Sequence, residues 1–300
     1  MRLILLCCAA ATLAAETLDV AVQRIAGQTV EKFQPKGLAK DKLAMTVIDL
    51  RTGKQASYRG NVPIYPASVV KLFYLVAAHQ QMEASKLADT PELRRALHDM
   101  IVDSSNDATG MIVDSLTGTT GGPELPQAEL AAWLEKRNWM NRYFAGLGYE
   151  SINVNQKTFA EGPYGRERQG RGPQFENNNR LTTDATARLM QTIATRKAVT
   201  AARSEQMMTL LHREFAVPAT DPDDQAHGFS GSAMPAGAGY WAKAGWTSTT
   251  RHDATYVELP GGAHYVAVIF TLDNAKEAGI IPFAAGKLAA YFSAPDVLLH

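Results

Sequence analysis

YPASVVKLFYLVAA, residues 65–78, sets one serine and one lysine in an otherwise apolar run. The run is too long for an ordinary strand and predicts a helix buried on nearly all sides, with Pro66 at its entry. Ser68 and Lys71 would share one face of it. Burial disfavours a charged lysine and lowers its pKa from about 10.4, so that it can accept a proton from a serine hydroxyl. A lysine snorkelling from a surface helix has the same spacing and stays an alternative.

Two further polar motifs follow along the chain. SSN at residues 104–106 stands in a polar turn between two helical stretches, and it offers either a hydroxyl and an amide to a substrate or a helix cap. KAG at 243–245 stands on an expected strand, where a lysine presents positive charge and a glycine lets a ligand approach the backbone. An exposed lysine on an edge strand is the alternative interpretation.

The expected elements follow the order strand pair, helices, strand triplet, helix. LAMTVIDL at 43–50 and the turn after it predict a first hairpin, and a GG turn joins the last two strands. Helical patterns fill the middle of the chain, at 90–102, 130–139, 182–197 and 204–213, and a helix with a break near Pro282 closes it. The order predicts an antiparallel sheet built from both ends of the chain, with a helical lobe inserted. Two long irregular stretches, 156–180 and 217–240, are typical of functional or mobile loops.

Tyr-Pro-Ala-Ser-x-x-Lys, Ser-x-Asn and Lys-x-Gly, in this order, resemble the active-site serine penicillin-recognising enzymes, and class A β-lactamases in particular. The likeness spans about residues 43–292 and is weak between 150 and 180. It implies an α/β fold of the α+β kind, in which helices flank a five-stranded antiparallel sheet and the site lies beside an all-helical lobe. We expect the sheet lobe at about 16–84 and 206–300, and the helical lobe at about 85–205.

The resemblance also implies a role for each motif residue. Ser68 would be the acylated nucleophile, and Lys71 would take its proton. Ser104 would relay a proton to the leaving nitrogen, and Asn106 would hold the substrate's amide carbonyl. Lys243 would supply positive potential for Ser104 and for a substrate carboxylate.

The end of the third motif carries the remaining implied groups. The backbone N–H groups of Ser68 and Trp246 would form an oxyanion hole beside Gly245. Arg251, eight residues after Lys243, would fork onto a substrate carboxylate, unless it is a charge on the strand surface.

The chain departs from the family pattern at several positions. Ser105 stands where aspartate is usual, Ala244 where a hydroxyl residue is usual, and Trp246 where a smaller residue is common. The Glu-x-x-x-Asn motif of the deacylation base is missing, and Glu161 and Glu167 are its candidate replacements. This last departure separates the possible functions.

The sequence predicts a secreted serine hydrolase that acts through an acyl-enzyme, with β-lactam hydrolysis as the expected reaction. The first alternative is a D-alanyl-D-alanine carboxypeptidase or an esterase that deacylates β-lactams poorly. The second alternative is a non-catalytic module that binds penicillin or cell wall.

The first fifteen residues have the layout of a secretory signal peptide, with Arg2, an apolar run and two closing alanines. We expect its cleavage and a secreted or periplasmic mature chain of residues 16–300. Both cysteines, Cys7 and Cys8, lie in the signal, so the mature chain would have no disulfide. Lipid attachment at one of them stays open.

The composition narrows the classes of partner and cofactor that we expect. Lysine and arginine number 30, as do aspartate and glutamate, and without a basic stripe neither nucleic acid nor a membrane surface is expected. The seven histidines show no metal-ligand spacing, so we expect no metal and no cofactor. The expected protein is a monomer that acts on a small-molecule substrate.

Overall fold

The computed structural model describes residues 16–159, 161–215 and 224–294. The expected signal peptide, with Cys7 and Cys8, falls outside these ranges. Five strands form one antiparallel sheet in the order β2-β1-β5-β4-β3, which confirms the predicted fold class. The strands are β1 Leu43–Asp49, β2 Gln55–Tyr58, β3 Gly239–Trp246, β4 Thr250–Glu258 and β5 His264–Leu272.

The sheet joins the two ends of the chain, as the order of elements predicted. β1 pairs with β5 along its whole length, for example with Met45 opposite Ile269. β3 pairs with β4, where Lys243 lies opposite Ala254, and has no second partner strand among the described residues. This edge strand carries the third motif.

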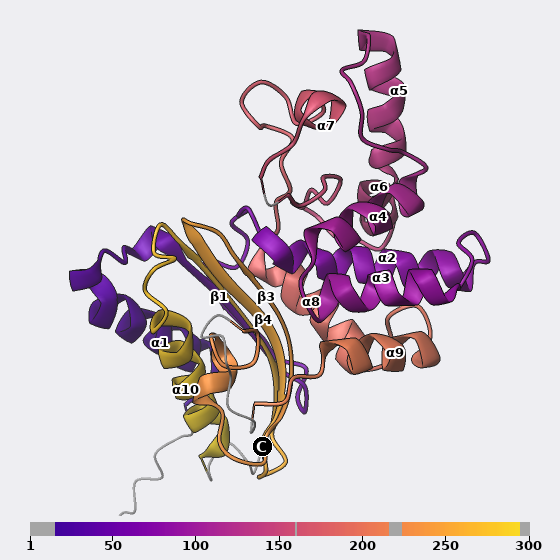
Figure 1. The fold of residues 1–300 in the computed structure, drawn as a ribbon. Helices are drawn as coiled ribbons and strands as arrows, with labels where there is room; N and C mark the ends of the chain where they lie inside the picture. Colours follow the sequence, from indigo (N-terminus) through magenta and orange to yellow (C-terminus); the bar gives the residue numbers. More distant parts are fainter. Residues whose placement is uncertain (1–15, 160, 216–223, 295–300) are drawn as a thin grey trace, which may run out of the picture.

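Ten α-helices surround the sheet in the described part of the chain (Figure 1). They are α1 Leu18–Phe33, α2 Lys71–Glu83, α3 Pro91–Ile101, α4 Asn106–Thr117, α5 Gln127–Arg137, α6 Trp139–Gly146, α7 Gly165–Gln169, α8 Thr183–Ala194, α9 Ala201–Leu211 and α10 Ile280–Ser293. Short 3-10 turns lie at Gln34–Lys36, Lys40–Lys42, Ala67–Val70 and Ser230–Ala233.

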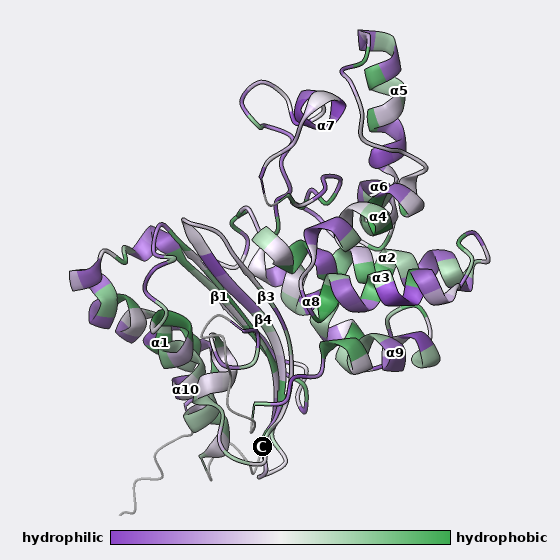
Figure 2. Ribbon diagram, viewed as in Figure 1, coloured by the Kyte–Doolittle hydropathy of each residue, from purple (hydrophilic) through white to green (hydrophobic). Residues whose placement is uncertain are grey.

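The helices divide between the two faces of the sheet. α1 and α10 cover one face, while α8 packs on β1, β4 and β5 from the other (Figure 1). α2 packs among α3, α4, α8 and α9, and the part with α5 and α7 projects from the body (Figure 1). Hydrophobic residues gather where the helices pack, whereas α7 and its flanking loop are mainly hydrophilic (Figure 2).

The predicted buried helix begins with a 3-10 turn. Ser68 lies in the turn at Ala67–Val70, and Lys71 starts α2. All but two of the 13 residues of α2 are buried, so apolar contacts surround it on nearly every side. This packing on nearly all sides holds the serine and the lysine at the start of the helix in fixed positions.

Some elements differ from the sequence-based expectation. α1, α6 and α7 were not predicted: α7 lies within the stretch 156–180 that was expected to be irregular, and α1 buries residues at helical spacing, such as Val22, Ile25 and Val30. α10 has no break, because Pro282 lies in its first turn, where an N–H is not needed for the helix. The division into lobes stays a prediction. No described helix is long and apolar enough to cross a bilayer.

We predict that Phe73→Ala lowers the free energy of unfolding by about 3–5 kcal/mol, because it empties a buried aromatic cluster. The Phe73 ring lies 4.9 Å from the Phe144 ring and 5.9 Å from the Tyr149 ring, centroid to centroid. Val20→Ala on the exposed face of α1 is the control and should change it by less than about 0.5 kcal/mol. Urea unfolding measures both, and equal changes in the two variants would contradict the central place of α2.

Candidate active site

Ser68 lies in a constrained turn at the start of α2. Ala67 before it has φ +46°, in the left-handed region that non-glycine residues rarely adopt. Tyr65 O accepts a hydrogen bond from Nε2 of the buried His252 at 2.9 Å, and Nδ1 accepts from the Thr271 N–H at 3.2 Å. Burial lowers the pKa of His252 to about 4, so its ring is neutral and fully used in holding this turn.

Lys71 is completely buried one turn after Ser68, and its own N–H donates to Ser68 O. Its Nζ donates to Ser104 O at 2.5 Å, to Asn106 Oδ1 at 3.0 Å and to Ser104 Oγ at 3.3 Å. Burial lowers the pKa of Lys71 to about 7, and no described carboxylate offsets this effect. Its neutral form is therefore accessible near pH 7.

Ser104 lies between two lysines. Its Oγ is 2.9 Å from Lys243 Nζ as well as 3.3 Å from Lys71 Nζ. Its φ is +57°, so this turn is also held in the left-handed region. Ser105 caps α4, with Oγ accepting from the Ala108 N–H at 3.1 Å. The motif thus serves both as a helix cap and as a junction of polar side chains.

Lys243 is completely buried on β3. Besides Ser104 Oγ, its Nζ contacts Gln225 Oε1 at 2.7 Å and Ala244 O at 2.8 Å. Burial holds the pKa of Lys243 well below its usual value, and Lys71 lowers it further by charge repulsion. Gln225 was not predicted, because a single glutamine in an irregular stretch belongs to no motif.

Gly245 brings β3 against the turn of Ser68. A Cβ at this position would lie 2.6 Å from the Ser68 nitrogen and 2.8 Å from the Val69 nitrogen, closer than real contacts allow. Trp246 follows, and 38% of its surface is exposed. The last residues of β3 therefore run directly beside the backbone of the candidate nucleophile.

Arg251 lies opposite Trp246 in the register of β3 and β4. Its guanidinium packs 4.2 Å from the Phe229 ring, and Nη2 donates to Gly228 O at 2.6 Å. Phe229 also lies 5.5 Å from the Trp246 ring, centroid to centroid. Arg251 is thus near the end of β3 but is largely buried.

Glu167 lies on α7 with its carboxylate in a cluster of ions. Oε1 is 2.5 Å from Nη2 of the buried Arg137 and 3.1 Å from Lys157 Nζ. Asp114 completes the cluster, 2.7 Å from Lys157 and 3.3 Å from Arg137. Within the described residues, no hydrogen bond or ion pair joins Glu167 to the lysines of the motifs.

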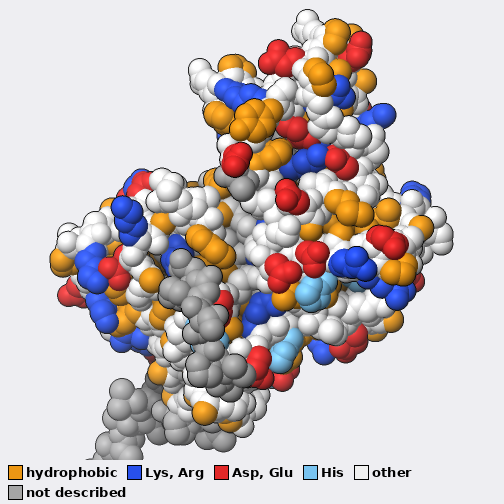
Figure 3. All heavy atoms as spheres, viewed as in Figure 1, with side chains coloured by type: hydrophobic (Ala, Val, Ile, Leu, Met, Phe, Trp, Pro, Cys, Tyr) orange, Lys and Arg blue, Asp and Glu red, His pale blue; other side chains and the backbone are white. Residues whose placement is uncertain are grey.

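Glu161 is exposed at the rim of a groove of about 580 Å³ that begins at Asn106. The groove runs between α4 and residues 157–159 and 161–164, and Asp107 and Tyr164 also line it. Figure 3 shows a hollow between the projecting part and the body, with acidic side chains beside it. Glu161 and Glu167 thus differ in access, since one borders open space and the other is buried.

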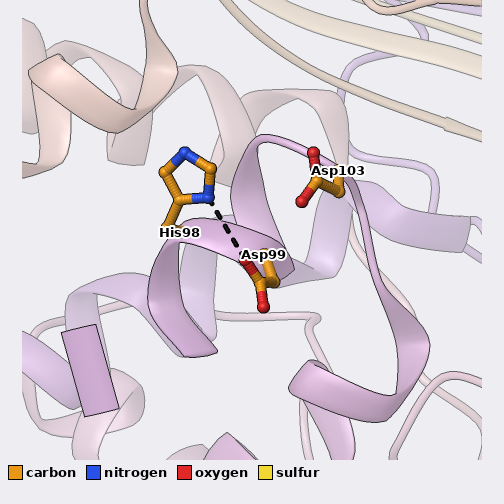
Figure 4. Close-up of side chains that lie close together, drawn as sticks. All are labelled: His98, Asp99 and Asp103. Atoms are coloured by element: carbon orange, nitrogen blue, oxygen red, sulfur yellow. Dashed lines mark hydrogen bonds and ion pairs between the residues drawn. The ribbon is translucent and has the colours of Figure 1, made fainter. Parts of the chain in front are cut away.

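A second cluster of titratable groups lies at the end of α3. His98, Asp99 and Asp103 come close together there, and His98 Nδ1 is 3.2 Å from Asp99 Oδ1 (Figure 4). The groups are largely exposed. Nothing else at this cluster points to a ligand, so we assign it no function.

Ser68, Lys71, Ser104, Asn106, Lys243 and Gly245 are thus brought together from the sheet and the helices. Such a set can support acyl transfer: a hydroxyl nucleophile, an amine that loses its charge near neutral pH, and a second hydroxyl that passes protons between two amines. Of the other predicted charged residues, Arg251 and Glu161 lie at the edges of this set, and Glu167 belongs to a separate ion cluster.

Solved structures with this fold are numerous. A beta-lactamase from Chitinophaga pinensis DSM 2588 shares 19% identity at a TM-score of 0.65, covering 88% of this chain and 98% of that one. PBP-A shares 20% at 0.64, covering 93% and 98%. A mutant of PBP-A, solved as an acyl-enzyme complex with penicillin G, shares 18% at 0.63, covering 90% and 97%.

No curated protein sequence matches the chain. The model of the beta-lactamase enzyme family matches residues 28–94 and 87–289, which is most of the sequence. The chain therefore belongs to the beta-lactamase enzyme family.

Proposed function

We propose that this protein is a serine hydrolase that works by acyl transfer, with β-lactams among the amides that acylate Ser68. The observation that carries the proposal is the meeting of two buried lysines at one hydroxyl. Lys71 Nζ and Lys243 Nζ lie 3.3 Å and 2.9 Å from Ser104 Oγ, and Lys71 lies one turn after Ser68. A purely structural role would not favour burying two like charges together, because each loses its hydration.

Acylation would begin when neutral Lys71 takes the proton of Ser68 Oγ, which then attacks the substrate carbonyl carbon. The backbone N–H groups of Ser68 and Trp246 would stabilise the oxyanion of the tetrahedral intermediate. Collapse breaks the C–N bond, and Ser104 donates its proton to the leaving nitrogen. Ser104 regains a proton from Lys71, so the protons balance.

Binding would use the groups around this centre. Asn106 already accepts from Lys71 through Oδ1, which leaves its amide N–H₂ to bind the substrate's amide carbonyl. Lys243 would attract the substrate carboxylate by its charge. The guanidinium of Arg251 packs against the Phe229 ring and donates to Gly228 O, and from this position it would add positive potential to the site.

β-Lactam hydrolysis requires a second step, in which a base activates water at the Ser68 ester. Glu161, on the open groove that starts at Asn106, is the better placed of the two candidate glutamates. The carboxylate of Glu167 is occupied by Arg137 and Lys157. Turnover of β-lactams would therefore depend on Glu161 or on Lys71 itself.

The surroundings of Lys71 favour a second candidate function, that of a D-alanyl-D-alanine carboxypeptidase or an esterase. No carboxylate among the described residues offsets the lowered pKa of Lys71, so no acid of this kind stands next to the base. An enzyme of this type would release natural acyl groups and keep penicillin bound. The contacts that join Lys71, Ser104, Asn106 and Lys243 beside Ser68 argue against a non-catalytic binding module.

We expect benzylpenicillin to add covalently to the wild-type protein, and the lifetime of the adduct after free penicillin is removed to separate the two candidate functions. Intact-mass spectrometry over time measures both. Ser68→Ala should form no adduct, whereas Ser115→Ala on the exposed face of α4 should behave as wild type. An adduct on the Ser68→Ala variant would refute the nucleophile, and a transient adduct with released product would favour the β-lactamase function over the second candidate.

The rate of acylation should rise with pH through about 7. Lys71 accepts a proton only when neutral, and burial lowers its pKa to about 7, so protonation below this pH removes the base. Single-turnover acylation by a chromogenic cephalosporin, from about pH 5 to about pH 9, measures the profile. Lys71→Arg should abolish the reaction, because arginine does not deprotonate. Lys54→Arg on the surface is the control, and its acylation rate should rise with pH as in the wild type. A rate independent of pH across this range would contradict the role of Lys71.

Gly245→Ala should slow acylation by about 100-fold, because misplacing reacting groups by about 1 Å costs a factor of this order. Its Cβ would overlap the Ser68 nitrogen, at 2.6 Å, and push the nucleophile turn away from β3. Gly27→Ala in α1 is a matched control, since its Cβ would meet nothing within 4 Å. The acylation rates of both variants give the test, and equal rates would show that β3 does not set the position of Ser68.

A further inference from the structure

Gln225 uses its whole side-chain amide. Oε1 accepts from Lys243 Nζ at 2.7 Å and from the Ala244 N–H at 3.0 Å. Nε2 donates to Ile101 O at 3.0 Å and to Val102 O at 2.8 Å. Since an amide offers two donor hydrogens and two acceptor positions, all four are in use.

These four bonds connect the end of α3 to β3, beside the bond from Lys243 Nζ to Ser104 Oγ. Ile101 is the last residue of α3, Val102 is its C-cap, and the chain reaches Ser104 two residues later. On the other side, the N–H of the buried Ala244 donates to Gln225 from the edge strand β3. The carbonyl groups at the end of a helix and the N–H groups at the edge of a sheet lack partners within their own elements. The amide of Gln225 supplies hydrogen-bond partners to both, namely to Ile101 O and Val102 O and to the Ala244 N–H.

We infer that Gln225 is a positioning residue of the acyl-transfer site, which holds the Lys243 ammonium against Ser104 Oγ and fixes the turn of Ser104 to β3. The inference rests on the proposed function. A lysine ammonium has three hydrogens, and Ser104 Oγ, Gln225 Oε1 and Ala244 O are its three acceptors. Removing one acceptor frees the ammonium to leave the relay serine.

The choice of an amide also sets the charge of this site. Lys243 faces Lys71 from α2, Arg213 from the segment after α9 and Asp253 from β4. An amide accepts a hydrogen bond without adding negative charge, so it orients Lys243 and leaves its positive potential available to a substrate carboxylate. A glutamate of the same shape would pair with Lys243 and neutralise this potential.

Two substitutions at Gln225 should act in opposite directions. Gln225→Glu adds an opposite charge and raises the pKa of Lys243, whereas Gln225→Met removes an acceptor and lowers it. Because the charge of Lys243 supports both Ser104 and the substrate carboxylate in the proposed mechanism, deprotonation of Lys243 should slow acylation at high pH, and this alkaline limb of the rate should move up by about one pH unit or more in Gln225→Glu and down in Gln225→Met. At neutral pH both variants should acylate at least about tenfold more slowly than wild type.

The experiment combines the acylation profile with a titration of Lys243, followed by NMR of ¹³Cε-labelled lysine and assigned through Lys243→Arg. Gln127→Glu, at an exposed position in the first turn of α5, is the control and should leave both readouts unchanged. Opposite shifts support the inference. Unmoved limbs and an unmoved Lys243 titration overturn it, even if the melting temperature falls.

Two other results, a variant that fails to fold and a wild type that is not acylated, can be told apart from failure of the inference about Gln225. If Gln225→Met does not fold, Gln225→Glu, which keeps the shape of the side chain, decides alone. If wild type is not acylated by the probe, the proposed function fails, while the titration of Lys243 still reports on Gln225.

Discussion

Two buried lysines that share one hydroxyl impose the main constraint on this structure. Lys71 and Lys243 are both inaccessible to solvent, and Ser104 Oγ lies within hydrogen-bonding reach of both. Burial lowers the pKa of both lysines, and the charge of Lys71 lowers the pKa of Lys243 further. The carbonyl groups of the turn at 104–105, Asn106 and Gln225 replace the water that the ammonium groups have lost.

This arrangement depends on rigid surroundings. α2 is buried on nearly all sides, and the turns that carry Ser68 and Ser104 both contain a non-glycine residue at positive φ. Strained conformations of this kind persist only where neighbouring contacts determine them. Here His252 holds the chain before Ser68, and Gly245 allows β3 to approach it more closely than any other residue would permit. The accuracy of the site therefore comes from packing around it as much as from the motif side chains.

Periodicity and element order in the sequence were sufficient to predict an antiparallel sheet and the buried helix, and the family resemblance predicted that the three motifs would meet. The sequence did not predict that Gln225 contacts Lys243, or that the Glu167 carboxylate points to Arg137. Both stand in irregular stretches, where no period fixes which way a side chain points. Arg137, which binds Glu167, reads as an ordinary charge at the end of a helix, yet its side chain is completely buried. Such pairings depend on tertiary contacts between distant segments.

The cluster around Glu167 bears on how one fold supports different fates of an acyl-enzyme. Burying Arg137 with Glu167 and Asp114 costs desolvation energy, which the ion pairs offset only while all partners are in place. Freeing Glu167 to activate water would leave Arg137 buried with one partner fewer, an outcome that costs several kcal/mol. The ion pairs with Arg137 and Lys157 therefore hold this carboxylate in place by energy as well as by geometry. The structure thus contains two separate charged clusters, one around Lys71 and Lys243 and the other beside α7.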